Sequence, residues 1–176
     1  MNEIFKGIRP LDYVLAGGLT VAGAYLMYQN MNAAYAAGLP HPLTTTTGAM
    51  LPLFVAVTLP ILWRRRNILA VIGITALATA VHVIMFGWIT RCGVELPLTF
   101  ALAYALARFA RTGTDRLIGL ATIVVVQVLV IARDASIDTI LSAMPVALPG
   151  VALFYGIGLL VQNRISKKQP AAVVAA

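Results

Sequence analysis

Charged residues are scarce in this chain of 176 residues, of which only 11% are Asp, Glu, Lys or Arg. A soluble domain carries about 25% charged residues and about 45–50% apolar ones. This chain is 60% hydrophobic, with a mean hydropathy of +0.90. The shortage of charge excludes a soluble enzyme, a nucleic-acid-binding protein and a disordered chain. The composition predicts a single all-α domain, a polytopic bundle of membrane-spanning helices.

Potential metal ligands are also few, because the sequence has one cysteine and two histidines. Cys92 alone excludes an internal disulfide framework and a cysteine-based zinc cluster. His41, His82, Cys92 and Glu95 are the candidate ligands expected on one side of the membrane, and no spacing motif links them. We therefore predict no metal site and no cofactor. We expect Cys92 to be a free thiol in a short loop, with a disulfide across a dimer as the alternative.

Clusters of charge divide the chain into six apolar stretches, at residues 11–31, 49–63, 68–89, 96–109, 117–132 and 140–161. A membrane span needs about 17–25 residues, which the first, third and sixth stretches provide. The others have only about 14–16 residues, so a re-entrant or interfacial placement stays open for them. The first stretch is too long for a signal peptide, and we expect it to be retained as a helix. None of the stretches holds an internal acidic residue, which argues against a secondary transporter.

The basic residues predict the topology. If all six stretches span the membrane and the N-terminus is cytoplasmic, only Arg91 and Arg133 lie outside. The other eleven lie inside: Lys6, Arg9, Arg64, Arg65, Arg66, Arg108, Arg111, Arg116, Arg164, Lys167 and Lys168. Such a bias in short loops follows the positive-inside rule. We therefore predict a six-helix domain over residues 1–164 in the bacterial plasma membrane. Both termini are expected to be cytoplasmic, with a short disordered tail at 165–176.

The arginines near the predicted cytoplasmic turns are interpreted as topology anchors. These are Arg64, Arg65, Arg66, Arg108, Arg111 and Arg116. The run of three arginines directly follows Trp63, an amphipathic residue that is typical of the membrane interface. A binding patch for nucleic acid or phosphoinositide is the alternative interpretation, but so short a turn has little reach.

Four polar residues are candidates for sensing: His41, His82, Tyr35 and Gln127. His82 lies inside the third stretch, where an ionisable group is a functional hypothesis by default. The alternative is a neutral imidazole that hydrogen-bonds a neighbouring helix. Gln127 in the fifth stretch is expected to hydrogen-bond across helices.

The longest predicted outer loop, residues 32–48, contains no charged residue and holds both Tyr35 and His41. Long loops are where binding functions concentrate, so we expect a stimulus to act here. The alternative is a spacer that lies on the membrane surface, in which His41 is a solvated loop residue.

No catalytic set is recognisable, because the sequence has no glycine-rich phosphate loop and no nucleophile beside a base. We therefore predict no catalytic residue and no enzymatic activity. The pairs Gly18/Ala22 and Ala152/Gly156 have the small-residue spacing that permits close contact between membrane helices. Self-association in the membrane is the expected consequence.

Three short motifs carry a resemblance to a known family. Arg9-Pro10-Leu11-Asp12 opens the first stretch, and Leu59-Pro60 is separated by three residues from Arg64-Arg65-Arg66. Tyr104-Ala105-Leu106-Ala107-Arg108 precedes the next basic turn. In this order, the motifs resemble the N-terminal membrane domain of actinobacterial sensor histidine kinases of the nitrate/nitrite-response type. The resemblance extends over residues 8–164, although Asn67-Ile68 lacks the proline often found after the arginine run.

The resemblance implies an integral membrane signal-input module of a two-component system. Kinases of the family continue into a helix with a phosphoacceptor histidine and an ATP-binding domain. His41 in an outer loop and His82 in a span do not suit the phosphoacceptor role, so we predict a module without a kinase core. Its implied partners are the lipid bilayer and either a second copy or a full-length histidine kinase, with no nucleic acid. The alternatives are a small permease or channel-like subunit of a transport complex and, third, an intramembrane enzyme.

Overall fold

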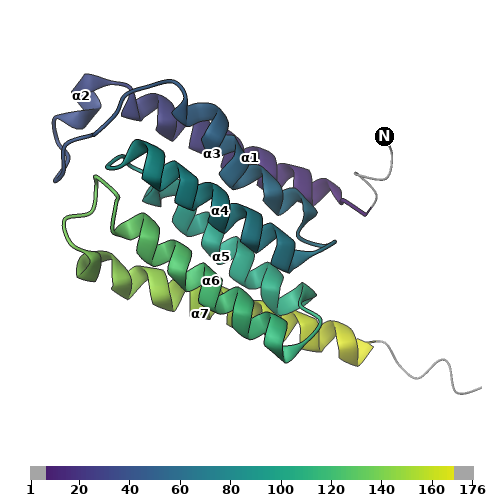
Figure 1. Ribbon diagram of the computed structural model, residues 1–176. Helices are drawn as coiled ribbons and strands as arrows, with labels where there is room; N and C mark the ends of the chain where they lie inside the picture. Colours follow the sequence, from purple (N-terminus) through teal and green to yellow (C-terminus); the bar gives the residue numbers. More distant parts are fainter. Residues whose placement is uncertain (1–6, 169–176) are drawn as a thin grey trace, which may run out of the picture.

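The computed structural model describes residues 7–168 as a bundle of antiparallel helices (Figure 1). Five helices are long and apolar enough to cross a membrane: α1 (Pro10–Asn30), α4 (Ile68–Phe86), α5 (Cys92–Phe109), α6 (Gly113–Ile131) and α7 (Ile140–Lys168). A shorter apolar helix combines α3 (Met50–Thr58) with the 3₁₀ helix η1 (Leu59–Trp63). Within the described residues, the remaining helix is the single turn α2 (Ala33–Ala36), and no strand is present. The predicted all-α membrane bundle is confirmed.

The bundle has two chemically different ends. The described chain begins and ends at the same end, which we call the arginine end because the 64–67 and 110–112 turns lie there (Figure 1). The opposite end carries the connections 31–49, 87–91 and 132–139, and we call it the loop end.

The three short stretches differ from one another in the structure. α5 begins at Cys92 and includes Glu95, and α6 begins at Gly113, so both reach spanning length. The expectation that the spans hold no acidic residue is therefore wrong for α5 and α6, whose first turns contain Glu95 and Asp115. α3 and η1 together span only about 24 Å, from the rises of the two helix types.

Side chains and turns at the arginine end fix where helices begin. The side chain of Asn67 accepts a hydrogen bond from the Ala70 N–H at 3.1 Å and caps α4. Thr112 and Asp115 cap α6 reciprocally, with bonds of 3.0 and 3.1 Å. The C-terminal helix α7 continues to Lys168, so the first four residues of the predicted disordered tail are helical. Residues 169–176 of that tail lie outside the described residues.

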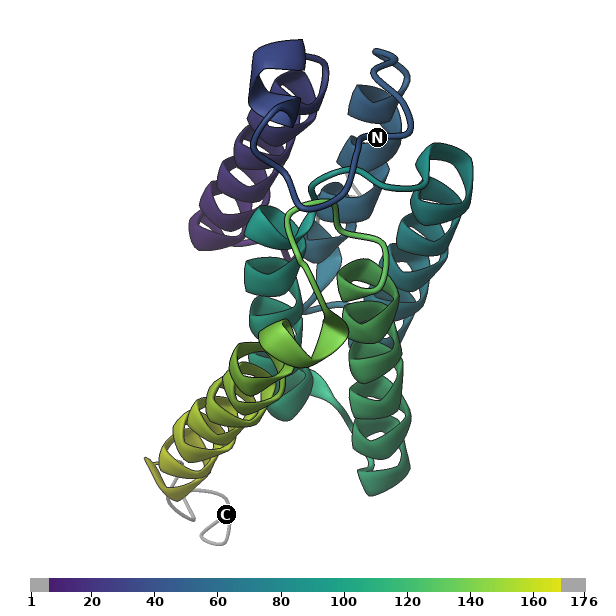
Figure 2. The ribbon, with the colours of Figure 1, turned by 90° about the vertical axis from the view of Figure 1, so that its left-hand side faces the viewer.

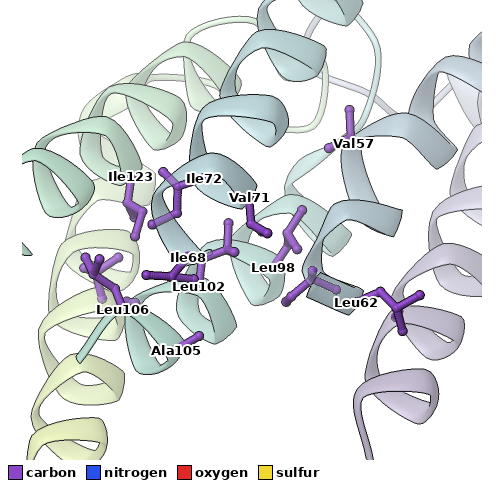
Figure 3. Close-up of a cluster of buried hydrophobic side chains, with 14 residues drawn as sticks. Val57, Leu62, Ile68, Val71, Ile72, Leu98, Leu102, Ala105, Leu106 and Ile123 are labelled. Atoms are coloured by element: carbon purple, nitrogen blue, oxygen red, sulfur yellow. The ribbon is translucent and has the colours of Figure 1, made fainter. Parts of the chain in front are cut away.

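The core centres on α5, which contacts α1, α4, α6 and α7. Figure 3 shows its leucines gathered against α4 and α6. The buried cluster includes Leu98, Leu102 and Leu106 of α5, Ile68, Val71 and Ile72 of α4, and Ile123 of α6. In a membrane, apolar burial alone gains little, so close packing has to hold these helices together.

Glycines provide the closest helix contacts. A Cβ on Gly158 of α7 would lie 2.6 Å from the Tyr104 carbonyl oxygen of α5, and a Cβ on Gly119 of α6 would lie 2.5 Å from Leu106. Gly18 and Gly156, from the pairs singled out in the sequence, have no atom within 4 Å of such a Cβ. Those two glycines therefore make no close helix contact within this chain.

Candidate functional site

Arg91 is the central residue of a buried polar cluster at the loop end. It directly precedes α5 and its exposed fraction is 0%. Its Nε donates to Nδ1 of His82 at 3.0 Å, and its terminal nitrogens donate to the carbonyl oxygens of Arg133 at 2.8 Å and of Ile89 and His82 at 3.4 Å. One side chain therefore joins α4, the 87–91 connection and the 132–139 connection.

The contact with Arg91 determines the state of His82. A guanidinium only donates hydrogen bonds, so Nδ1 of His82 must accept, and the neutral imidazole carries its proton on Nε2. Nε2 is buried and lacks a hydrogen-bond partner among the described residues. The ring packs edge-on against Phe54 and Phe86, with centroid distances of 5.3 and 4.8 Å. His82 thus lies in an apolar pocket, with the Arg91 guanidinium as its side-chain hydrogen-bond partner.

Arg91 keeps its charge in this buried position. Burial lowers the pKa of Arg91 to about 10, and the charges of Glu95 and Asp134 oppose this effect. The guanidinium is therefore protonated at neutral pH, and Arg91 contributes a buried positive charge beside the carboxylates of Glu95 and Asp134.

Asp134 links the 132–139 connection to the start of α5. Its carboxylate, at 0% exposure, accepts hydrogen bonds from the backbone N–H groups of Arg91 and Cys92 and from the N–H of Ser136 at 2.9 Å. A negative charge at a helix N-terminus is favoured by the unpaired N–H groups there. Asp134 thus caps the N-terminus of α5, although it lies about 40 positions further along the chain.

Glu95 is the fourth member of the buried cluster, which consists of His82, Arg91, Glu95 and Asp134. It lies in the first turn of α5 with an exposed fraction of 1%. Its Oε2 accepts a hydrogen bond from the Thr79 hydroxyl at 3.2 Å, and its Oε1 has no partner among the described residues. The cluster therefore has two buried atoms, Nε2 of His82 and Oε1 of Glu95, with unused hydrogen-bonding capacity.

The 31–49 connection lies over the loop end. Viewed from that end, it meets the 132–139 connection above the middle of the bundle (Figure 2). His41 donates its backbone N–H to Ala135 O at 3.2 Å, and its ring lies 4.2 Å from the Trp88 ring. Thr44 donates its N–H to Trp88 O at 2.9 Å and its hydroxyl to Phe86 O at 2.6 Å. We call residues 31–49 the lid.

Gly87, at the end of α4, lets the backbone pass close to Thr44 of the lid. Its φ of +58° is one that L side chains rarely adopt, and a Cβ there would lie 2.6 Å from the Thr44 hydroxyl. Close by, Asn30 at the end of α1 accepts bonds of 2.9 Å from both the N–H and the hydroxyl of Thr90. The residue before Arg91 is therefore tied to α1.

The four predicted sensing residues lie at three levels of the structure. His82 belongs to the buried cluster, whereas His41 and Tyr35 belong to the lid, where the Tyr35 hydroxyl lies 3.4 Å from that of Thr90. Gln127 lies deeper and joins three helices, because its amide donates to Thr99 at 3.0 Å and to Ala147 O at 3.3 Å. The sequence did not indicate Arg91 or Asp134 as site residues, since charges that flank an apolar stretch are most simply solvated.

The six predicted anchor arginines differ in their contacts and exposure. Arg64 donates to Oδ1 of Asp12 at 2.8 and 2.9 Å, and Arg65 donates to Oδ2 at 2.7 Å. Asp12 is fully buried, so this pair of arginines holds α1 against η1 rather than lying free at the membrane surface. Arg66 and Arg111 are exposed, whereas Arg108 and Arg116 are half-buried.

Cys92 begins α5 instead of lying in a loop. Its thiol is buried, with an exposed fraction of 6%, and is unpaired within the chain. Over the described part of the chain, no three His, Cys, Asp or Glu residues are grouped so as to hold a metal ion.

A comparison of the chain with protein-family models, curated proteins and solved structures finds no match. The function is therefore argued from the buried cluster and its surroundings.

Proposed function

We propose that the chain is a signal-input module of the bacterial plasma membrane, similar to the sensor domain of a two-component histidine kinase. The resemblance over residues 8–164 supports this role, and the excess of Lys and Arg at one end supports a cytoplasmic arginine end. In this orientation, both termini are cytoplasmic and the lid faces the outside. The partner is a second copy or a full-length histidine kinase.

The observation that carries the proposal is the buried cluster beneath the lid. The guanidinium of Arg91 depends on acceptors from α4 and the 132–139 connection, and His41 ties the lid to the same connection. A conformation in which a buried charge loses a hydrogen-bonding partner is strongly destabilised. A stimulus that displaces the lid therefore changes the preferred position of Arg91 and of the start of α5.

α5 provides a route from the loop end to the arginine end. It begins beside Arg91 and packs extensively along α7, with tight contacts at Gly150 and Gly158. α7 is the last described helix and ends at the arginine end (Figure 1). Because tightly packed helices shift as bodies, a displacement of α5 is passed to α7.

The distribution of buried charge favours signalling over transport. In the described residues, the buried ionisable side chains lie near the two ends: Asp12 and Arg64 at one, and His82, Arg91, Glu95 and Asp134 at the other. The middle of the bundle buries the uncharged Thr75, Thr99 and Gln127. Proton- or ion-coupled transport typically relies on ionisable groups along a pathway at membrane depth.

The test joins the full chain to the catalytic core of a kinase of the resembled type and measures autophosphorylation in membrane vesicles. We expect Arg91→Gln, or replacement of residues 38–47 by a Gly/Ser linker, to change the rate several-fold. Arg133→Gln is the matched control, because its carbonyl, which Arg91 uses, is retained, and its exposed guanidinium lies over the Trp88 ring at 5.6 Å outside the buried cluster. Equal rates in folded wild-type, Arg91 and linker variants would contradict the proposal.

A second measurement uses the chain alone. Spin labels at residues 112 and 163, both exposed at the arginine end, report the position of α7 relative to α6 in a Cys92→Ala background. We expect Arg91→Gln to shift the distance distribution and Arg133→Gln to leave it unchanged. An unchanged distribution in both variants would remove the proposed route through α5.

A further inference from the structure

Two hollows adjoin each other at the arginine end. The first is a polar pocket of about 210 Å³ between the start of α4 and the end of α5, and its lining includes Arg66, Asn67, Phe109, Arg111 and Asp115. The second is a groove of about 190 Å³ along η1 and α4, lined by Pro60, Trp63, Ala70, Val71 and Ile74 together with Arg66 and Asn67. Because Arg66 and Asn67 line both, the groove opens directly beside the pocket.

The polar pocket carries an excess of positive charge. Arg66 and Arg111 are both exposed. The ring of Phe109, the last residue of α5, lines the pocket, and the guanidinium groups of Arg65 and Arg108 lie 5.2 and 5.3 Å from its centre. Asp115 is the one carboxylate in the lining, and it already accepts a hydrogen bond from the Thr112 N–H at 3.1 Å. The pocket therefore suits a small anion.

The adjoining groove has the opposite character. Its wall is almost wholly apolar, and Ile74 in it is 54% exposed to the side of the bundle. From Asn67 to Ile74 the groove follows about 10 Å of α4, directed away from the arginine end. In a membrane, this direction leads from the headgroup level toward the hydrocarbon, with Trp63 at the interface.

From these two hollows we infer a binding site for one anionic phospholipid, whose phosphate lies between Arg66 and Arg111 and whose acyl chain lies along the groove. Because the basic pocket adjoins an apolar groove, the site suits a lipid better than a soluble anion, which would leave the groove unfilled. The inference requires only that the bundle lie in a membrane, so it holds whether or not the proposed signalling role does.

The test uses Trp63 as a reporter inside the groove. The chain has two tryptophans, so Trp88→Phe leaves Trp63 as the only source of tryptophan fluorescence. The full chain in vesicles is titrated with dibrominated phosphatidylglycerol or dibrominated phosphatidylcholine, whose bromine atoms quench a tryptophan in contact with the acyl chain. Comparison of the two curves gives the preference for the anionic lipid at this groove.

We expect phosphatidylglycerol to be preferred at least about fivefold, the effect of one basic residue near an anionic surface. In Arg66→Gln/Arg111→Gln the preference should fall to about one, as expected when the basic contacts are removed. Arg164→Gln, an exposed arginine of α7 that does not line either hollow, should retain it. Circular dichroism of the double variant verifies that the helices are intact.

Three outcomes would overturn the inference. The first is equal quenching by the two lipids in the parent protein, and the second is an undiminished preference in the folded double variant. The third is loss of the preference when soluble glycerol phosphate is added, which would identify a free phosphate ester as the occupant.

Discussion

Replacing a glycine of α7 by alanine should have different effects on stability at Gly158, which is buried, and at Gly156, which faces open space. Gly158 and Gly156 lie in the same helix, two residues apart. A Cβ at Gly158 would lie 2.6 Å from the Tyr104 carbonyl oxygen and 2.7 Å from the Ala107 Cβ, whereas a Cβ at Gly156 meets nothing within 4 Å. We predict that Gly158→Ala destabilises the bundle relative to Gly156→Ala.

The expected size of the difference follows from two terms. Replacing glycine by alanine inside a helix favours the helix by about 0.8–1 kcal/mol, and this term is the same at both positions. Overpacking costs about 1–3 kcal/mol and applies to Gly158 alone. The contact atoms there belong to the α5 backbone and to a Cβ, which no side-chain rotation can move. The free energies of unfolding of the two variants should therefore differ by about 1–3 kcal/mol.

The assay is reversible unfolding in mixed micelles, in which the fraction of sodium dodecyl sulfate is raised and the ellipticity and tryptophan fluorescence are followed. Both variants are measured beside the wild type, and Gly156→Ala is the matched control. A difference below about 0.5 kcal/mol, the range of ordinary surface substitutions, would refute the argument that α5 and α7 meet at Gly158.

Three further predictions concern the ends of the bundle. Asp12→Asn should destabilise the fold by about 3–5 kcal/mol in the same assay, because it leaves two arginines without their buried carboxylate. Asp115→Asn, at an exposed helix cap, should cost only about 1 kcal/mol. Equal effects of the two substitutions would contradict a special role of the buried Asp12. Arg91→Lys should cost about 1–3 kcal/mol, since an ammonium cannot reproduce the forked contacts to α4 and the 132–139 connection. An unchanged stability would argue against Arg91 as the central residue of the buried cluster. In intact cells, a cysteine at Thr46 should react with a membrane-impermeant maleimide and a cysteine at Thr112 should not; the reverse pattern would invert the proposed topology.

The helices were predictable because their signal is local. Long apolar runs at 11–31 and 68–89 contain enough information to identify α1 and α4 within a few residues. The start of α5 was not predictable in the same way, because Glu95 ended the apolar run although the helix begins at Cys92. A hydropathy pattern counts a carboxylate as a boundary, whereas the fold buries this one beside Thr79.

The site was only partly predictable, since its contacts join distant segments. His82 was identifiable as an ionisable residue inside a span, but its partner Arg91 had the sequence context of a solvated loop residue. Asp134 reaches the start of α5 from more than 40 residues away, and no spacing rule links the two. The pairing of Asp12 with Arg64 had a usable signal, because opposite charges were predicted at neighbouring helix ends on the same side.

The shortness of α3 and η1 has a consequence for the surrounding bilayer. At about 24 Å, this pair falls about 6 Å short of a hydrocarbon layer of about 30 Å. On the flank that these two helices form, the lipid must compress locally to keep polar backbone out of the hydrocarbon, at a fraction of a kcal/mol per Å. Two copies that turned these flanks toward each other would share one compressed patch instead of making two. The bilayer itself would then draw the copies together, and more strongly as its thickness increases.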